Sequence, residues 1–233
     1  MLDIIEEVDK KILEEFGLEL IDKYQLFMDE KEKEYYRENI GKIETDFLGF
    51  GNCYAMALKY IEENLEQNLD IVDLGCAWGL FSYIFRDYNY IGLDECCNTF
   101  FKYHNNCKYI RGSFPDTVPQ ADVFMAFMSL GYNRNFLLNA TNIEFIKKLR
   151  EAFLNYDFGF TDTEKWVEKV LEIDFTKTEI RCGATDRIYF WKKKDDILSE
   201  EEVESKIKDV INEEIENNPF HLEIAKELQR RLS

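Results

Sequence analysis

Histidine, proline and positive charge are all scarce in this chain of 233 residues. It contains two histidines and three prolines. With so few histidines, a Ser/His/Asp catalytic arrangement is not supportable. Lysine and arginine number 29 against 47 aspartates and glutamates, so the formal net charge is −18. Such a charge repels a phosphate backbone, and the one basic cluster is Lys192 to Lys194, so nucleic acid is disfavoured as a substrate.

Long apolar runs are also absent. No stretch approaches the roughly 18 to 20 consecutive apolar residues of a membrane span, and the N-terminus does not resemble a signal peptide. We therefore expect a cytoplasmic protein without membrane attachment. The six cysteines are scattered, which favours free or buried thiols in a reducing compartment over disulfides. The spacing of Cys96, Cys97, His104 and Cys107 matches no zinc template, so no metal site is predicted.

The stretch from Ile71 to Leu80, IVDLGCAWGL, carries the most information. An apolar run that ends in an acidic residue and continues with small residues predicts a buried strand, a tight turn and the first turn of a helix. Gly75 and Gly79 tolerate positive φ angles and allow a ligand to approach the backbone closely. The N–H groups at the start of the helix would stabilise an anionic group.

From about residue 69 the sequence alternates between strand and helix patterns, which predicts a parallel sheet covered on both faces. Strands are expected at 70–74, 88–94, 108–112, 121–128 and within 153–160. Helices are expected at about 79–87, 96–104 and 141–152, with a turn or helix at 161–169. The β-rich runs 170–182 and 187–194 are too close in sequence to be parallel neighbours. They predict an antiparallel hairpin that closes the sheet.

Helical patterns flank this core and divide the chain into three parts. We expect an N-terminal helical cap segment at 1–66, a core at 67–195 and an acidic helical tail at 196–233. Residues 53–65 form the helix that leads into the first strand. In the tail, Ser199 and Glu202 make a capping-box pattern. An apolar stripe follows at helical spacing, formed by Val203, Ile207, Val210, Ile211 and Ile215. The tail is expected to pack on the domain or on another subunit, which would allow a homo-oligomer.

Four features of residues 70–194 point to one family. The turn reads Asp73-x-Gly75-x-Ala77-x-Gly79, and Asp94 ends the second strand 21 residues after Asp73. The run RGSFPD (111–116) follows the third strand, and the hairpin ends the sheet. Together they resemble a class I S-adenosylmethionine (SAM)-dependent methyltransferase, whose turn is acidic-x-Gly-x-Gly-x-Gly; alanine replaces the middle glycine here.

The resemblance implies a three-layer Rossmann-like fold, SAM as cofactor, and methyl transfer to an acceptor that is a small molecule or a protein rather than nucleic acid. It also implies a set of cofactor contacts. Gly75, Cys76 and Ala77 would pass under the methionine part, within the turn that Gly79 completes, and Asp73 would orient its amino group directly or through water. The other implied contacts are Asp94 on the ribose, Leu93, Glu95 and Cys96 beside ribose or adenine, Ser113 and Phe114 at the adenine edge, and Met128 and Ser129 near the reactive methyl.

A general base is needed only if the methyl acceptor is protonated. The candidates near the pocket mouth are Tyr54, Tyr132, Asn133 and Arg134. The Asn-Pro-Pro-Tyr type sequence of amino-nucleic-acid methylases is absent, since the fourth strand continues as MSLGYNR (128–134).

Two alternatives stay open. One is an NAD(P)-binding Rossmann protein, which also places an acidic residue about 20 positions after a glycine-rich turn. Its Gly-x-Gly-x-x-Gly pattern would need glycines where this chain has Ala77 and Leu80. The other is a SAM-binding but catalytically idle module that acts in interaction or assembly through its helical ends.

Overall fold

The structure is a computed structural model that describes residues 51–65, 68–77, 79–83, 85–95, 105–127, 129–130, 134–182, 186–196 and 198–218. Several predicted features lie outside these residues. They are the helices expected within 1–50, at 96–104 and at the end of the tail, the adjacent cysteines Cys96 and Cys97, and the site candidates Met128, Tyr132 and Asn133.

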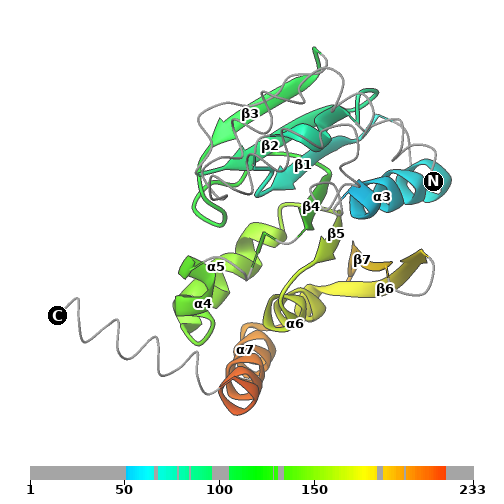
Figure 1. The fold of residues 1–233 in the computed structure, drawn as a ribbon. Helices are drawn as coiled ribbons and strands as arrows, with labels where there is room; N and C mark the ends of the chain where they lie inside the picture. Colours follow the sequence, from blue (N-terminus) through cyan, green and yellow to red (C-terminus); the bar gives the residue numbers. More distant parts are fainter. Residues whose placement is uncertain are drawn as a thin grey trace, which may run out of the picture.

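Seven strands form one mixed sheet in the order β3-β2-β1-β4-β5-β7-β6 (Figure 1). The strands β1 to β5 are parallel to one another, and β7 is antiparallel to both β5 and β6. Their bounds are β1 Asp70–Leu74, β2 Asn89–Asp94, β3 Cys107–Arg111, β4 Val123–Phe127, β5 Phe158–Asp162, β6 Phe175–Cys182 and β7 Asp186–Lys193. The predicted closing hairpin is therefore confirmed.

Helices cover both faces of this sheet (Figure 1). The helix α3 (Gly51–Asn64) packs on one face, in a core that includes Ile71 and Phe190. The helices α5 (Ile143–Phe153) and α6 (Lys165–Asp174) share a core with Val72 and Trp191 on the other face. Successive strand residues such as Ile71 and Val72 thus enter opposite cores, as the pleat requires. The predicted three-layer, mostly parallel Rossmann-like fold with an antiparallel C-terminal hairpin is confirmed.

Two secondary-structure predictions were wrong. In place of a helix at 79–87 there is a short 3₁₀ helix, η3 (Leu80–Tyr83), stabilised by bonds from Ser82 N to Gly79 O (3.2 Å) and Phe85 N to Ser82 O (3.1 Å). Residues 170–174, predicted as the start of a strand, form the second half of α6. Val167, Val170 and Leu171 are buried together at helical spacing, and this packing selects the helix. The short helix α4 (Arg134–Asn139) was not predicted.

The tail begins with the predicted helix, α7 (Glu200–Asn217). Its capping box is present, with Ser199 N donating to Glu202 Oε2 (2.9 Å) and Glu202 N to Ser199 Oγ (3.3 Å). Val203, Ile207 and Val210 are buried in the core that also holds α5 and α6. The expectation that this helix packs on the domain is confirmed. Of the helices within the described ranges, none combines the length and apolar character needed to cross a membrane.

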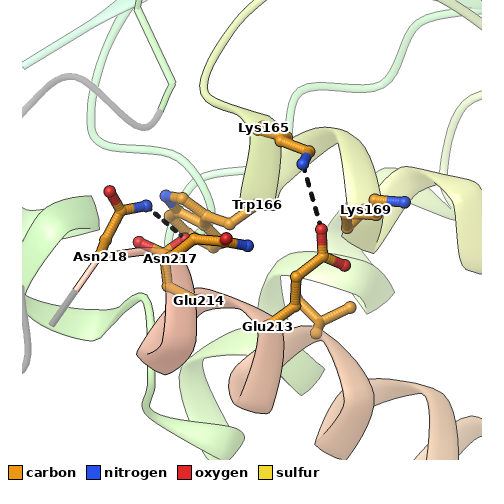
Figure 2. Close-up of a pocket in the computed structure, with 8 residues that line it drawn as sticks. Lys165, Trp166, Lys169, Glu213, Glu214, Asn217 and Asn218 are labelled. Carbon is orange, nitrogen blue, oxygen red and sulfur yellow. Dashed lines mark hydrogen bonds and ion pairs between the residues drawn. The ribbon is translucent and has the colours of Figure 1, made fainter.

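A small cavity lies between α6 and α7 (Figure 2). Lys165 Nζ and Glu213 Oε1 form an ion pair of 3.2 Å at its rim, and Asn218 Nδ2 donates to Glu214 Oε2 (3.1 Å). Trp166 Nε1, also on its wall, is buried without a hydrogen-bond partner in the described part of the chain. The cavity lies between two helices and not at the carboxyl edge of the sheet, where the predicted site lies.

Candidate functional site

The turn after β1 folds back against the end of β2. Gly75 N and Cys76 N both donate to the carbonyl of Leu93, at 2.8 and 3.1 Å. The φ angles are +84° at Gly75, +49° at Ala77 and +77° at Gly79. Gly75 and Gly79, which the sequence predicts to tolerate positive φ, both adopt it. Ala77 adopts the same left-handed region, which costs a residue with a Cβ about 1–2 kcal/mol.

The close packing at the two glycines is against side chains of this protein. A Cβ at Gly75 would lie 2.4 Å from Ser129 Cβ, and one at Gly79 would lie 2.3 Å from the Tyr109 ring. Ser129 Oγ donates to Leu74 O (2.5 Å), which ties the end of β4 to the end of β1. The absence of side chains at positions 75 and 79 therefore lets the turn after β1 pack closely against Ser129, which follows β4, and against Tyr109 of β3.

Asp94, at the end of β2, is bonded directly to this turn. Its Oδ2 accepts a hydrogen bond from Ala77 N at 3.0 Å. The next strand is tied in as well, because Gly112 N donates to Asp94 O (3.1 Å). The two acidic residues of the sequence motif, Asp73 and Asp94, thus lie at the same edge of the sheet, with the turn between them.

Asp73 has an unusual set of hydrogen bonds. Its side chain is completely buried. The hydroxyls of Tyr54 on α3 and Tyr90 on β2 both donate to Oδ2, at 2.9 and 2.5 Å. Its other oxygen, Oδ1, is buried and has no hydrogen-bond partner in the described part of the chain. Oδ2 therefore accepts two hydrogen bonds, whereas Oδ1 accepts none from the described residues.

Burial raises the pKa of Asp73 to about 7. The hydrogen bonds from Tyr90 and Tyr54 lower it, and the nearby charge of Asp94 raises it further. Burial and the charge of Asp73 also raise the pKa of both tyrosines well above the ordinary value. Both hydroxyls therefore remain protonated and act as donors. For Tyr54, this geometry favours a role as hydrogen-bond donor to Asp73 over the predicted role as general base.

The remaining predicted contacts divide into two groups. Leu93 is buried beneath the turn, Glu95 is exposed just after β2, and Ser113 is half-buried with its carbonyl accepting from Thr117 N (2.8 Å). Phe114 is buried against Phe153 of α5, with 5.1 Å between ring centroids. The structure therefore gathers Leu93 with the turn residues and Asp94, and it places the Phe114 ring in the core beside α5.

Tyr90 was not identified from the sequence as a site residue. The available signal was weak: a tyrosine early in a buried strand needs a partner for its hydroxyl. Asp73 on the neighbouring strand is that partner, but the pairing depends on the β1–β2 register, in which Tyr90 stands opposite Ile71.

No protein-family model matches the chain, and no curated protein sequence matches it. Among solved structures, it is similar to magnesium protoporphyrin IX methyltransferase (ChlM) from Synechocystis PCC 6803 with bound SAM. The identity is 13% and the TM-score 0.49, covering 80% of this chain and 97% of that one. It is also similar to the E. cuniculi Mtq2–Trm112 complex responsible for methylation of the eRF1 translation termination factor, at 16% identity and TM-score 0.43, covering 62% and 94%.

A third similar structure is the bifunctional kinase–methyltransferase WbdD, at 13% identity and TM-score 0.39. The match covers 64% of this chain and 39% of that one, so this chain spans about two fifths of the length of WbdD. All three likenesses are remote.

Proposed function

We propose that this chain is a SAM-dependent methyltransferase whose cofactor binds over the carboxyl ends of β1 and β2. The observation that carries the proposal is Oδ1 of Asp73, which is buried two residues before the turn and has no hydrogen-bond partner among the described residues. A buried carboxylate oxygen without a partner is costly. The ammonium group on the methionine part of SAM would supply both a hydrogen bond and the opposite charge.

The position of the turn in the sheet supports this site. Strand order reverses between β1 and β4. The strands β2 and β3 lie on one side of β1, and the strands β4 and β5 lie on its other side. Ligands of open parallel sheets bind outside the carboxyl ends of the strands at such a reversal. Gly75 follows β1, and Ser129, which packs against it, follows β4.

The residues of the turn are suited to hold the cofactor. We propose that Gly75, Cys76 and Ala77 lie under its methionine part and that Asp94 binds the ribose hydroxyls. The bond from Ala77 N fixes the Asp94 carboxylate, and a carboxylate offers about four acceptor positions. Leu93, Glu95, Cys96, Ser113 and Phe114 are proposed to border the nucleoside, although the Phe114 ring also packs on Phe153. Met128 and Ser129 are proposed to lie near the reactive methyl group.

SAM, when bound, supplies a methyl group that is already activated on a sulfonium. The work left for the protein is to orient the ligand, align the acceptor and exclude water. Asp73, the turn and Asp94 would do the first of these. Tyr132, Asn133 and Arg134 remain the proposed candidates for a general base, which is needed only if the acceptor is protonated. The net charge of −18 supports a small-molecule or protein acceptor over nucleic acid.

Two features argue against the dinucleotide alternative. A pyrophosphate at this turn would meet the carboxylate of Asp73, and like charges at short range repel. The strand β7 is antiparallel, whereas a dinucleotide-binding sheet would be extended by a further parallel strand. The idle-module alternative loses part of its motivation because the apolar stripe of α7 packs against its own domain. We also propose that the chain is divided into an N-terminal cap at 1–66, a core at 67–195 and a tail at 196–233.

Isothermal titration calorimetry tests the proposal directly. We expect S-adenosylmethionine and its demethylated product to bind and NAD⁺ not to bind. No binding of either sulfur ligand by folded protein would refute the proposal. Transfer of a labelled methyl group to a small molecule or a peptide would then distinguish the enzyme from the idle module, which binds but does not transfer.

A further inference from the structure

Two tyrosines from different parts of the fold bind the same oxygen of Asp73. Tyr54 comes from α3, which covers the sheet, and Tyr90 comes from β2, within the sheet. Their hydroxyls lie 2.9 and 2.5 Å from Oδ2, and both side chains are buried. We refer to Tyr54 and Tyr90 as the tyrosine clamp.

Aromatic packing holds both rings of the clamp in place. The Tyr54 ring stacks on Phe81 with 4.2 Å between centroids and meets Phe127 edge-on at 4.8 Å. The Tyr90 ring lies 6.1 Å from Phe85 and 6.3 Å from Tyr109. Neither hydroxyl can move far without repacking these rings. The orientation of the Asp73 carboxylate is therefore fixed by the core.

The clamp is asymmetric, and this has a consequence for ligand binding. Both tyrosine hydroxyls donate to Oδ2, so Oδ1 accepts no hydrogen bond from the described residues. The same two hydroxyls could instead have donated to one oxygen each. Among the described residues, the side-chain partners of Asp73 are the two tyrosine hydroxyls, and neither of them is basic. A cationic ligand group is the missing complement to this arrangement.

We propose that Tyr54 and Tyr90 are positioning residues that hold Asp73 with Oδ1 available to the ammonium group of the ligand, and thereby set the affinity for its amino-acid part. This inference rests on the proposed function and names residues of this chain that control the same site. The clamp hydroxyls bond Asp73, whereas in the proposed binding mode the nucleoside lies at Asp94. Its effect is therefore restricted to ligands that carry the ammonium.

The test compares two thioethers, in both of which the sulfur is uncharged, by isothermal titration calorimetry at pH 8. S-adenosylhomocysteine has the amino-acid part, and 5′-methylthioadenosine has the same nucleoside without it. For Tyr90→Phe we expect the affinity for S-adenosylhomocysteine to fall about tenfold or more, because Asp73 loses one of the two hydrogen bonds that hold its carboxylate in place and favour its charged form. The affinity for 5′-methylthioadenosine should stay within about twofold, since nothing near the nucleoside changes.

Tyr54→Phe tests the clamp from α3 and should give the same selective loss, which also covers the case in which one variant fails to fold. Tyr156→Phe is the matched control, because Tyr156 is another buried tyrosine but its hydroxyl has no partner among the described residues. It should leave both affinities unchanged. Circular dichroism and thermal melts establish that each protein is folded.

The possible outcomes distinguish a failure of the clamp from a failure of the proposed methyltransferase function. If the unmodified protein binds neither thioether, the proposed function fails and the clamp fails with it. If it binds both, and the folded clamp variants lose affinity for both equally or for neither, only the clamp is refuted. A loss confined to S-adenosylhomocysteine supports the clamp.

Discussion

Replacing Asp73 by asparagine should make the ligand-free protein more stable at alkaline pH. In the folded protein, burial raises the pKa of this carboxyl from 3.8 to about 7. Between these values the folded state binds the proton more tightly than the unfolded state does. The stability contribution of Asp73 is therefore complete below pH 3.8 and is lost as the pH rises through about 7.

The size of this loss follows from the two pKa values. Their difference corresponds to about 4 kcal/mol of unfolding free energy at pH 8.5. Of this, about 2 kcal/mol is lost between pH 5.5 and 8.5. In Asp73→Asn the amide oxygen can keep the bonds from Tyr54 and Tyr90, but a buried NH₂ group replaces Oδ1 and costs about 1–3 kcal/mol. The net gain at pH 8.5 should be about 1–3 kcal/mol.

Urea unfolding of the ligand-free proteins at pH 5.5, 7 and 8.5 measures this effect. The stability difference between Asp73→Asn and the unmodified protein should move in favour of the variant by about 2 kcal/mol over this range. Asp196→Asn controls for the loss of one charge, because Asp196 is exposed. The variant should also bind S-adenosylhomocysteine more weakly, a trade of stability against function.

A pH-independent difference would refute the reasoning. So would a variant whose disadvantage grows as the pH rises, since that would mean the ionised carboxylate stabilises the fold. In either case, the unpaired oxygen of Asp73 could no longer be taken as a cost that a ligand removes.

Three further predictions concern the turn, the ribose contact and the core. Gly75→Ala should lower the unfolding free energy by about 2 kcal/mol or more, because of its positive φ and a Cβ 2.4 Å from that of Ser129; a thermal melt close to that of the unmodified protein would contradict this. Asp94→Ala should weaken binding of S-adenosylhomocysteine and of 5′-methylthioadenosine alike, by about tenfold, since both carry the ribose; calorimetry with an unchanged affinity would show that the ribose is held elsewhere. Arg150→Ala should cost about 3 kcal/mol in urea unfolding, because it leaves Asp174, bound by two bonds of 2.6 and 2.8 Å, as an unpaired and mostly buried carboxylate; Lys148→Ala, at an exposed ion pair, should cost under about 1 kcal/mol.

Local sequence was sufficient for much of the sheet. The strand at 70–74 was predicted at its observed bounds, because an apolar run that stops at a glycine turn has one plausible structure. The antiparallel β6–β7 pair followed from the short loop between two β-rich runs, which no crossover could span. The capping box of α7 is equally local, since Ser199 and Glu202 are three residues apart.

Where two local structures suit the same residues, the sequence led to an error. Residues 170–174 are apolar and β-branched enough for a strand, but α6 extends to Asp174 because its buried face continues to contact α5 and α7. Residues 79–87 carry apolar side chains suited to a helix. The bonds from the Tyr109 hydroxyl to Gly79 O (3.2 Å) and Ser82 Oγ (3.0 Å) accompany a short 3₁₀ helix there instead.

The sequence by itself determined where the turn lies and that Asp73 and Asp94 flank it, because those features depend on spacing along the chain. It did not determine which atoms of Asp73 are left for a ligand. That was decided by tertiary structure, since Tyr54, Asp73 and Tyr90 come from a helix and two strands and meet only when α3 packs on the sheet. Hydrogen bonds between distant elements leave no period or spacing in the sequence, so the unpaired oxygen became visible only in the folded chain.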